Sequence, residues 1–278
     1  MTRAGSESDP RRGEQPRRPS ESGSTMSTST DLVSSLPTMA FPPDAAAHAA
    51  DGVIDLELFP TAWCGVGGER GGEVVPRWFP ALADLGVAQV HLFWAVPETG
   101  HAASALDGLR SASGRWLAEL RALGLEGELS IKRGEPAAWL AALADISPGS
   151  LIVLGPPARG QPSATLQHLL QHGRQPLLLL PDLVYSPEIP LLARPVIDAG
   201  VPRAAGLPGG AALWDTPRTE WLDLAPLEPL PAARTALRRA EDSDASLIVL
   251  SRRSTALAPL LVQYGTFPVL VLPAAPPH

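Results

Sequence analysis

The chain has 278 residues, of which 45% are hydrophobic, and this suits one large domain or two of ordinary size. Its formal net charge is −7, with 22 basic and 29 acidic residues. That balance argues against a nucleic-acid-binding surface, which needs clustered lysine and arginine, and the single cysteine, Cys64, excludes an internal disulfide and any multi-cysteine metal site.

The first 50 residues differ in composition from the rest of the chain. Residues 1–50 are rich in Ser, Thr, Pro, Arg, Gly and Ala, so they cannot bury enough apolar area to offset their ordering entropy, and we expect them to be disordered. Met26 lies within them and is an alternative start. The arginine pairs of this segment are not followed by the apolar run of a secretory signal, and no apolar stretch of the chain is long enough to span a bilayer. We therefore expect a cytoplasmic protein with no membrane contact.

From residue 51 onward, strand and helix patterns alternate. Strands are predicted at residues 53–59, 89–96, 129–132, 150–154 and 177–180, and helices at residues 78–85, 102–123, 135–146 and 164–172. The glycine-rich stretch 65–72 lacks the Gly-x-Gly-x-x-Gly spacing of dinucleotide-binding loops and is interpreted as a flexible connector. The alternation predicts an α/β fold for residues 51–182: a Rossmann-like, doubly wound, parallel five-stranded sheet.

The last part of this domain recurs near the end of the chain. The sequence that begins at Ser150 (SLIVL) returns at Ser246, and the strand that begins after Pro176 (LLLL) returns after Pro268 as VLVL. We therefore expect residues 183–278 to be a smaller, degenerate second copy of the same unit. Residues 183–230 are rich in proline with only weak strand candidates, so we expect this copy to have lost its second strand and the helix that follows it.

These motifs, in this order, resemble the universal stress protein family. In that family a strand ending Leu-Gly leads into a loop with the pattern Gly-x-x-Gly-x9-Gly-[Ser/Thr], then a helix and a final strand, and residues 151–180 follow that plan. The resemblance covers residues 53–182 and returns over residues 231–273. It implies a bacterial stress-response protein. Because members of the family pair through their last strands, it also implies an intramolecular pseudo-dimer through strands 177–180 and 269–272, or a homodimer.

The nucleotide-binding positions depart from the family pattern. ATP-binding members place an aspartate after the first strand, where this chain has Ala62. Strict loop spacing puts Ala158, His168 and Leu169 where the family has Gly, Gly and Ser or Thr. Counting back from the last strand instead puts Ser163 and Ala164 at the final pair, which implies a shortened loop. Three prolines in the same loop have no N–H to offer a phosphate. If a nucleotide site is retained, the residues that would form it are Thr61, Gly155, Arg159, Gly160 and Ser163.

Each candidate also has a simpler structural interpretation. Gly155 suits a tight turn, and Ser163 is a typical helix N-cap. We interpret Arg252 and Arg253 as a solvated surface pair rather than an anion site. Cys64 reads as a passive thiol.

His168 and His172 stand four residues apart, as metal-binding pairs can. They lack the carboxylate of a His-Glu-x-x-His motif, so we interpret them as surface histidines and predict no metal site. No catalytic motif is visible either.

Three functional hypotheses follow. The first is a non-catalytic stress-response or regulatory protein with degenerate nucleotide-binding loops, no cofactor and an unidentified protein partner. The second is a switch protein that binds ATP or a related adenine nucleotide through the residues above. The third is a nucleotide hydrolase, which is the weakest because no activated nucleophile or general base is evident.

Overall fold

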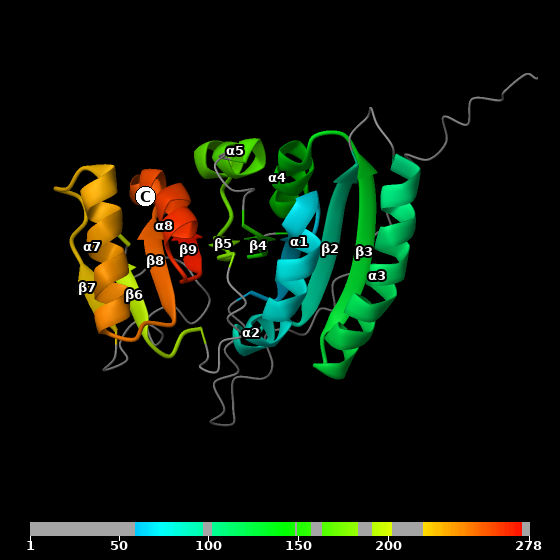
Figure 1. Ribbon diagram of the computed structural model, residues 1–278, viewed down its shortest axis with the longest axis horizontal. Helices are drawn as coiled ribbons and strands as arrows, with labels where there is room; N and C mark the ends of the chain where they lie inside the picture. The colour runs from blue at the N-terminus through cyan, green and yellow to red at the C-terminus, as the bar shows by residue number, and fades with distance from the viewer. Residues whose placement is uncertain are drawn as a thin grey trace, which may run out of the picture. The chain divides into compact units, whose positions relative to one another are not determined.

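The computed structural model describes residues 59–96, 102–147, 149–156, 163–182, 191–201 and 219–273, and for 68–70, 102–108, 110 and 144–146 it describes the backbone alone. The described strands form one nine-stranded sheet in the order β3-β2-β1-β4-β5-β9-β8-β6-β7 (Figure 1). Every neighbouring pair is parallel except β5 and β9, which are antiparallel. The predictions for residues 1–50 and 53–58 lie outside the described residues.

The first half of the sheet is the predicted five-stranded parallel α/β unit, which is thereby confirmed. Its strands are β1 (Thr61–Gly65), β2 (Gln89–Val96), β3 (Glu126–Arg133), β4 (Leu151–Leu154) and β5 (Leu177–Leu179). Its helices are α1 (Gly68–Val74), the 3-10 turn η1 (Val75–Trp78), α2 (Phe79–Asp84), α3 (Ala102–Ala122), α4 (Pro136–Ile146) and α5 (Ala164–His172).

The start of this unit differs from the prediction in two places. The first described strand is β1 at residues 61–65, after the stretch 53–59 whose alternating pattern was expected to form it. The glycine-rich stretch is not a connector: most of it is the helix α1. Its glycines are required by close packing, since a Cβ at Gly72 would lie 3.2 Å from the ring of Trp116.

The second half repeats the strand arrangement in shorter form. Its elements are β6 (Pro195–Asp198), β7 (Glu220–Leu222), α7 (Pro229–Asp242), β8 (Leu247–Ser251), the 3-10 segment η2 (Arg252–Leu257), α8 (Ala258–Tyr264) and β9 (Val269–Leu272). The order β8-β6-β7 matches β4-β1-β2, so β7 occupies the position of β2 and the expected loss of the second strand is wrong. Residues 223–228, between β7 and α7, contain neither strand nor helix, so the elements without a counterpart there are α3 and β3.

The two halves are joined through their last strands, as the family resemblance implied. In β5 and β9, Leu177 pairs with Val271, Leu178 with Leu270, and Leu179 with Val269. All of these residues are buried, and the apolar core runs continuously from one half to the other on both faces of the sheet. Residues of α1, α2 and α3 pack on one face, and α4, α5, α7 and α8 on the other. In the part of the chain that the structure describes, no helix is long and apolar enough to cross a membrane.

The shared core predicts that a cavity at the joint destabilises the whole sheet. Leu270 is 1% exposed and faces Leu178 across the antiparallel pair, so Leu270→Ala is expected to lower the free energy of unfolding by about 2–5 kcal/mol. Leu227→Ala is the matched control, because Leu227 is 41% exposed and its truncation should change stability by less than about 0.5 kcal/mol. Urea unfolding followed by circular dichroism measures both. A Leu270→Ala cost no larger than the control's would contradict the shared core.

Candidate functional site

Open parallel sheets bind ligands at the carboxyl ends of their strands, where the chain's crossovers diverge to opposite sides. The first half has such a point between β1 and β4, whose last residues Gly65 and Leu154 pair with each other. The second half has one between β6 and β8, where Ile197 pairs with Val249. These two edges are therefore the places to look for a site.

The backbone is closely packed at this edge of the first half. Gly155, which follows β4, lies against α1 so closely that a Cβ on it would be 3.1 Å from the Cα of Gly71. A Cβ on Gly71 would in turn be 3.1 Å from the carbonyl carbon of Val66 and 3.2 Å from the carbonyl oxygen of Gly65. Helix α1 thus packs directly on the ends of β1 and β4, and the glycines serve this contact.

The predicted site residues are not all brought together here. Gly155 and Ser163 both follow β4, but the Ser163 hydroxyl is the N-cap of α5 and accepts a hydrogen bond from the Leu166 N–H at 3.3 Å. Arg159 and Gly160 lie outside the described residues.

The placement of Thr61 at this edge is wrong. Thr61 is the first residue of β1 and pairs with Gln89, the first residue of β2. Four residues of extended chain separate it from Gly65, which amounts to about 13 Å along the strand. Thr61 therefore lies toward the opposite edge of the sheet from Gly155.

The edge of the second half carries a buried carboxylate. Asp198, at the end of β6, is 2% exposed, and its Oδ1 accepts a hydrogen bond from the Gly200 N–H at 3.1 Å. Its Oδ2 accepts hydrogen bonds from the hydroxyl of Ser251 at 2.7 Å, the hydroxyl of Ser254 at 2.6 Å and the Ser251 N–H at 3.3 Å. Four donors from the chain itself thus satisfy this carboxylate, as a buried charge requires.

The strand register shows which positions of the two halves correspond. Leu151 pairs with Ala62 and Leu247 pairs with Pro195, and the sequence repeat equates Leu151 with Leu247. Gly65 lies three residues after Ala62 in β1, and Asp198 lies three residues after Pro195 in β6, so Asp198 corresponds to Gly65. The position in the first half that corresponds to Asp198 is therefore Gly65, whereas Ala62 is fully buried inside β1.

The sequence alone does not single out Asp198. It stands between prolines in a stretch with weak strand signals, and only the placement of β6 beside β8 reveals it as the end of a first strand. The available signal was the segment PVIDAG, residues 195–200, in which an apolar strand leads into an acidic residue and a turn.

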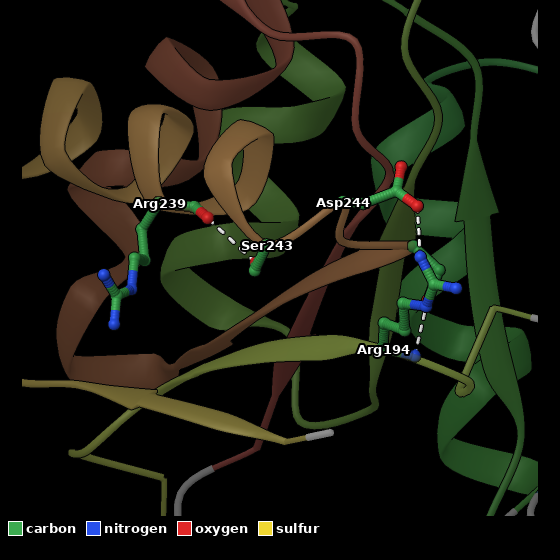
Figure 2. Close-up of polar contacts among 5 residues, drawn as sticks. Arg194, Arg239, Ser243 and Asp244 are labelled. Atoms are coloured by element: carbon green, nitrogen blue, oxygen red, sulfur yellow. Dashed lines mark hydrogen bonds and ion pairs between the residues drawn. The ribbon is translucent and has the colours of Figure 1, made fainter.

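Polar contacts also hold the segment that leads into β6, the strand that ends at Asp198. Figure 2 shows the side chain of Arg194 in an ion pair with Asp244, which lies at the end of α7. The Arg194 N–H also donates to the Ser246 hydroxyl at 3.0 Å, and that hydroxyl donates to the carbonyl of Leu191 at 2.7 Å. The Ser243 hydroxyl donates to the Arg239 carbonyl at 2.8 Å within the same turn (Figure 2).

Arg252, directly after β8, links the second half to the first. Its Nη1 donates to the carbonyls of Leu169 and Leu170 at 2.8 and 2.9 Å, and its Nη2 donates to the carbonyl of Gln175 at 2.9 Å. A cation at the last carbonyls of a helix is favourable, and here the helix is α5 of the first half. Burial lowers the pKa of the Arg252 guanidinium from its ordinary value. The interpretation of Arg252 as a solvated surface residue is therefore wrong, whereas Arg253 is exposed.

The remaining reactive side chains are held in structural roles. Cys64 is fully buried, and burial raises the pKa of its thiol, which disfavours the reactive thiolate. His91 is buried in the middle of the sheet, paired with Glu128 and stacked on Trp63 with ring centroids 4.1 Å apart. Among the described residues no group of three or more His, Cys, Asp and Glu side chains is arranged to hold a metal ion.

The backbone contact at Gly155 predicts opposite effects for two Gly→Ala substitutions. Gly155→Ala should lower stability by about 1–3 kcal/mol, because the new methyl group meets the backbone of Gly71. Gly114→Ala, in α3, should raise stability by about 0.5–1 kcal/mol, because nothing lies within 4 Å and alanine favours the helix. Thermal unfolding of the two variants tests this. Equal shifts of the same sign would contradict the close packing of α1.

Because Arg252 binds three carbonyls and Arg253 is exposed, replacing each of them should affect stability differently. Arg252→Ala should cost about 2 kcal/mol, since three carbonyls lose a charged donor. Arg253→Ala should change stability by less than about 0.5 kcal/mol, as is usual for an exposed residue. Denaturant unfolding of both variants measures the difference, and similar midpoints would show that Arg252 does not hold α5.

No protein-family model and no curated protein matches the sequence. Solved structures do. A universal stress protein from Archaeoglobus fulgidus DSM 4304 is similar with a TM-score of 0.58 and 12% identity, over 78% of this chain and 98% of its own. A protein of unknown function from Pseudomonas aeruginosa PAO1 is similar with a TM-score of 0.51 and 14% identity, over 78% of this chain and 93% of its own. Since residues 51–182 make up less than half of the chain, both matches include residues of the two halves. The chain therefore has the fold of the universal stress proteins, as the sequence motifs predicted.

Proposed function

We propose that this chain is a non-catalytic stress-response or regulatory protein of the universal-stress-protein type, whose nucleotide-binding positions have become part of its own packing. The observation that carries the proposal is that both strand edges where a nucleotide would bind are occupied by the chain. In the first half the backbone of Gly71 lies against Gly155. In the second half the Asp198 carboxylate is satisfied by internal donors.

Phosphate binding at such an edge needs backbone N–H groups that face an open space. At Gly155 that space is taken by α1, and the next residue, Pro156, has no N–H to contribute. In the second half the Ser251 N–H already donates to Asp198. Neither edge therefore offers the donor set of a phosphate cradle in its described part.

The same arrangement accounts for the other parts of the proposal. The matching strand order of the two halves supports a tandem duplication, and the β5–β9 pair supports an intramolecular pseudo-dimer. The Asp198 carboxylate accepts from the hydroxyls of Ser251 and Ser254, but it is 2% exposed and a substrate would not reach it. We therefore place the protein among binding or regulatory proteins that use no cofactor. We place it in the cytoplasm, acting through a protein partner.

Titration of the full chain with Mg·ATP and with AMP in a calorimeter tests the proposal. We expect no binding with a Kd below about 1 mM, which corresponds to about −4 kcal/mol. We also expect no release of phosphate from ATP above that of buffer alone.

Two variants locate a site if binding is seen. If the unmodified chain binds nucleotide with micromolar affinity and Ser163→Ala loses that binding, the proposal would be overturned in favour of an ATP switch in the first half. Affinity lost in Asp198→Ala, with the variant still folded by circular dichroism, would overturn it in favour of a site in the second half. Turnover that is lost in Ser163→Ala would instead indicate a hydrolase.

A further inference from the structure

Helix α5 carries two imidazoles on its exposed side. His168 and His172 are four residues apart, and both side chains are exposed. Their ring centroids lie 4.8 Å apart with the ring planes tilted by 55°. Residues at this spacing lie one above the other on a helix, so both rings project from the same face.

The ring separation agrees with chelation of one ion. A transition metal binds imidazole nitrogen at about 2.0–2.1 Å, which places the centroids of two imidazoles on one metal about 5 Å apart. The rings are tilted by 55° rather than stacked face to face, an arrangement that two ligands of one ion can adopt. The observed centroid separation therefore matches that of a chelating pair.

The helix that presents the pair is held at both ends. At its N-terminus the Ser163 hydroxyl accepts from the Leu166 N–H, and at its C-terminus Arg252 binds the carbonyls of Leu169 and Leu170. Leu166, Leu169 and Leu170 anchor the opposite side of α5 in the core. The backbone between the two histidines is thus fixed by tertiary contacts, and binding would lose little conformational entropy.

Exposed residues surround the pair along the helix. The residue one turn before His168 is Ala164, which is small and exposed. No described His, Cys, Asp or Glu completes a set of three with these histidines. The ion would therefore be held by two protein nitrogens, with water in the remaining positions.

We propose that His168 and His172 form a chelating site for a divalent transition metal that favours imidazole, of the class of Cu²⁺, Ni²⁺ and Zn²⁺. The site does not involve the strand edges discussed above and does not depend on the proposed function. Because it spans the last turn of α5, the bound ion would stiffen the turn whose carbonyls hold Arg252, and so strengthen the link between the two halves.

Titration of the full chain with NiCl₂ in a calorimeter, together with its thermal unfolding with and without Ni²⁺, tests the site. We expect one site whose affinity falls at least tenfold in His168→Gln and in His172→Gln, and a rise in Tm with Ni²⁺ that both variants lose. The matched control is the double variant Gln167→His with His168→Gln. It keeps two histidines on α5, since Gln167 is also exposed, but spaces them five residues apart on different faces.

The control variant separates chelation from general attraction of metal to histidine. Loss of the high-affinity site in this variant, with an unchanged circular dichroism spectrum, would support the pair as a chelate. Affinity equal to that of the unmodified chain would overturn the proposal, because binding would then not depend on the four-residue spacing. Absence of any Ni²⁺ binding or Tm shift in the unmodified chain would also overturn it.

Discussion

The structure depends on the antiparallel pair between β5 and β9. The described part of the second half has four strands, with β6 and β7 only four and three residues long, and no counterpart of α3 or β3 between β7 and α7. A fragment of this size would bury too little apolar surface to offset its chain entropy and would expose β9 as an edge. Pairing with β5 places β9 in the interior of the sheet, where Leu270 and Leu272 join the core of the first half. The second half is therefore stabilised by completing the sheet of the first.

Arg252 strengthens the same joint by a different kind of contact. It belongs to the loop after β8, which corresponds in the fold to the loop after β4 where the sequence motifs place nucleotide binding. Here that loop binds protein instead: Ser251 and Ser254 donate to Asp198 within the second half, and Arg252 donates to α5 of the first. The segment that begins at Arg252 thus contributes to holding the two halves together.

The sequence predicted those elements whose signal is local and strong. The strands β4, β5, β8 and β9 are short continuous apolar runs bounded by proline, serine or glycine. Their alternation with helical patterns predicted the α/β fold, and the family resemblance implied the β5–β9 pair. The position of β1 could not be predicted, because residues 53–59 alternate as a half-exposed strand does, whereas β1 is a buried strand with no alternation. That shift led to the placement of Thr61 at the wrong edge. The roles of Asp198 and Arg252 could not be predicted either, because they depend on neighbours 53 and 83 residues away in the sequence.

The two strand edges are closed in physically different ways. In the first half, opening the edge requires moving α1 away from Gly155, and the segment that follows Gly71 carries Val74 and Val75, both buried in the core. In the second half, opening requires only that Ser251 and Ser254 turn from Asp198, each hydrogen bond to the carboxylate contributing about 1.5–3 kcal/mol. A ligand that supplied new donors to Asp198 would offset that cost, whereas no ligand restores the apolar contacts of α1. The first closure is thus a property of the folded core, while the second is a set of polar contacts that equivalent donors can replace.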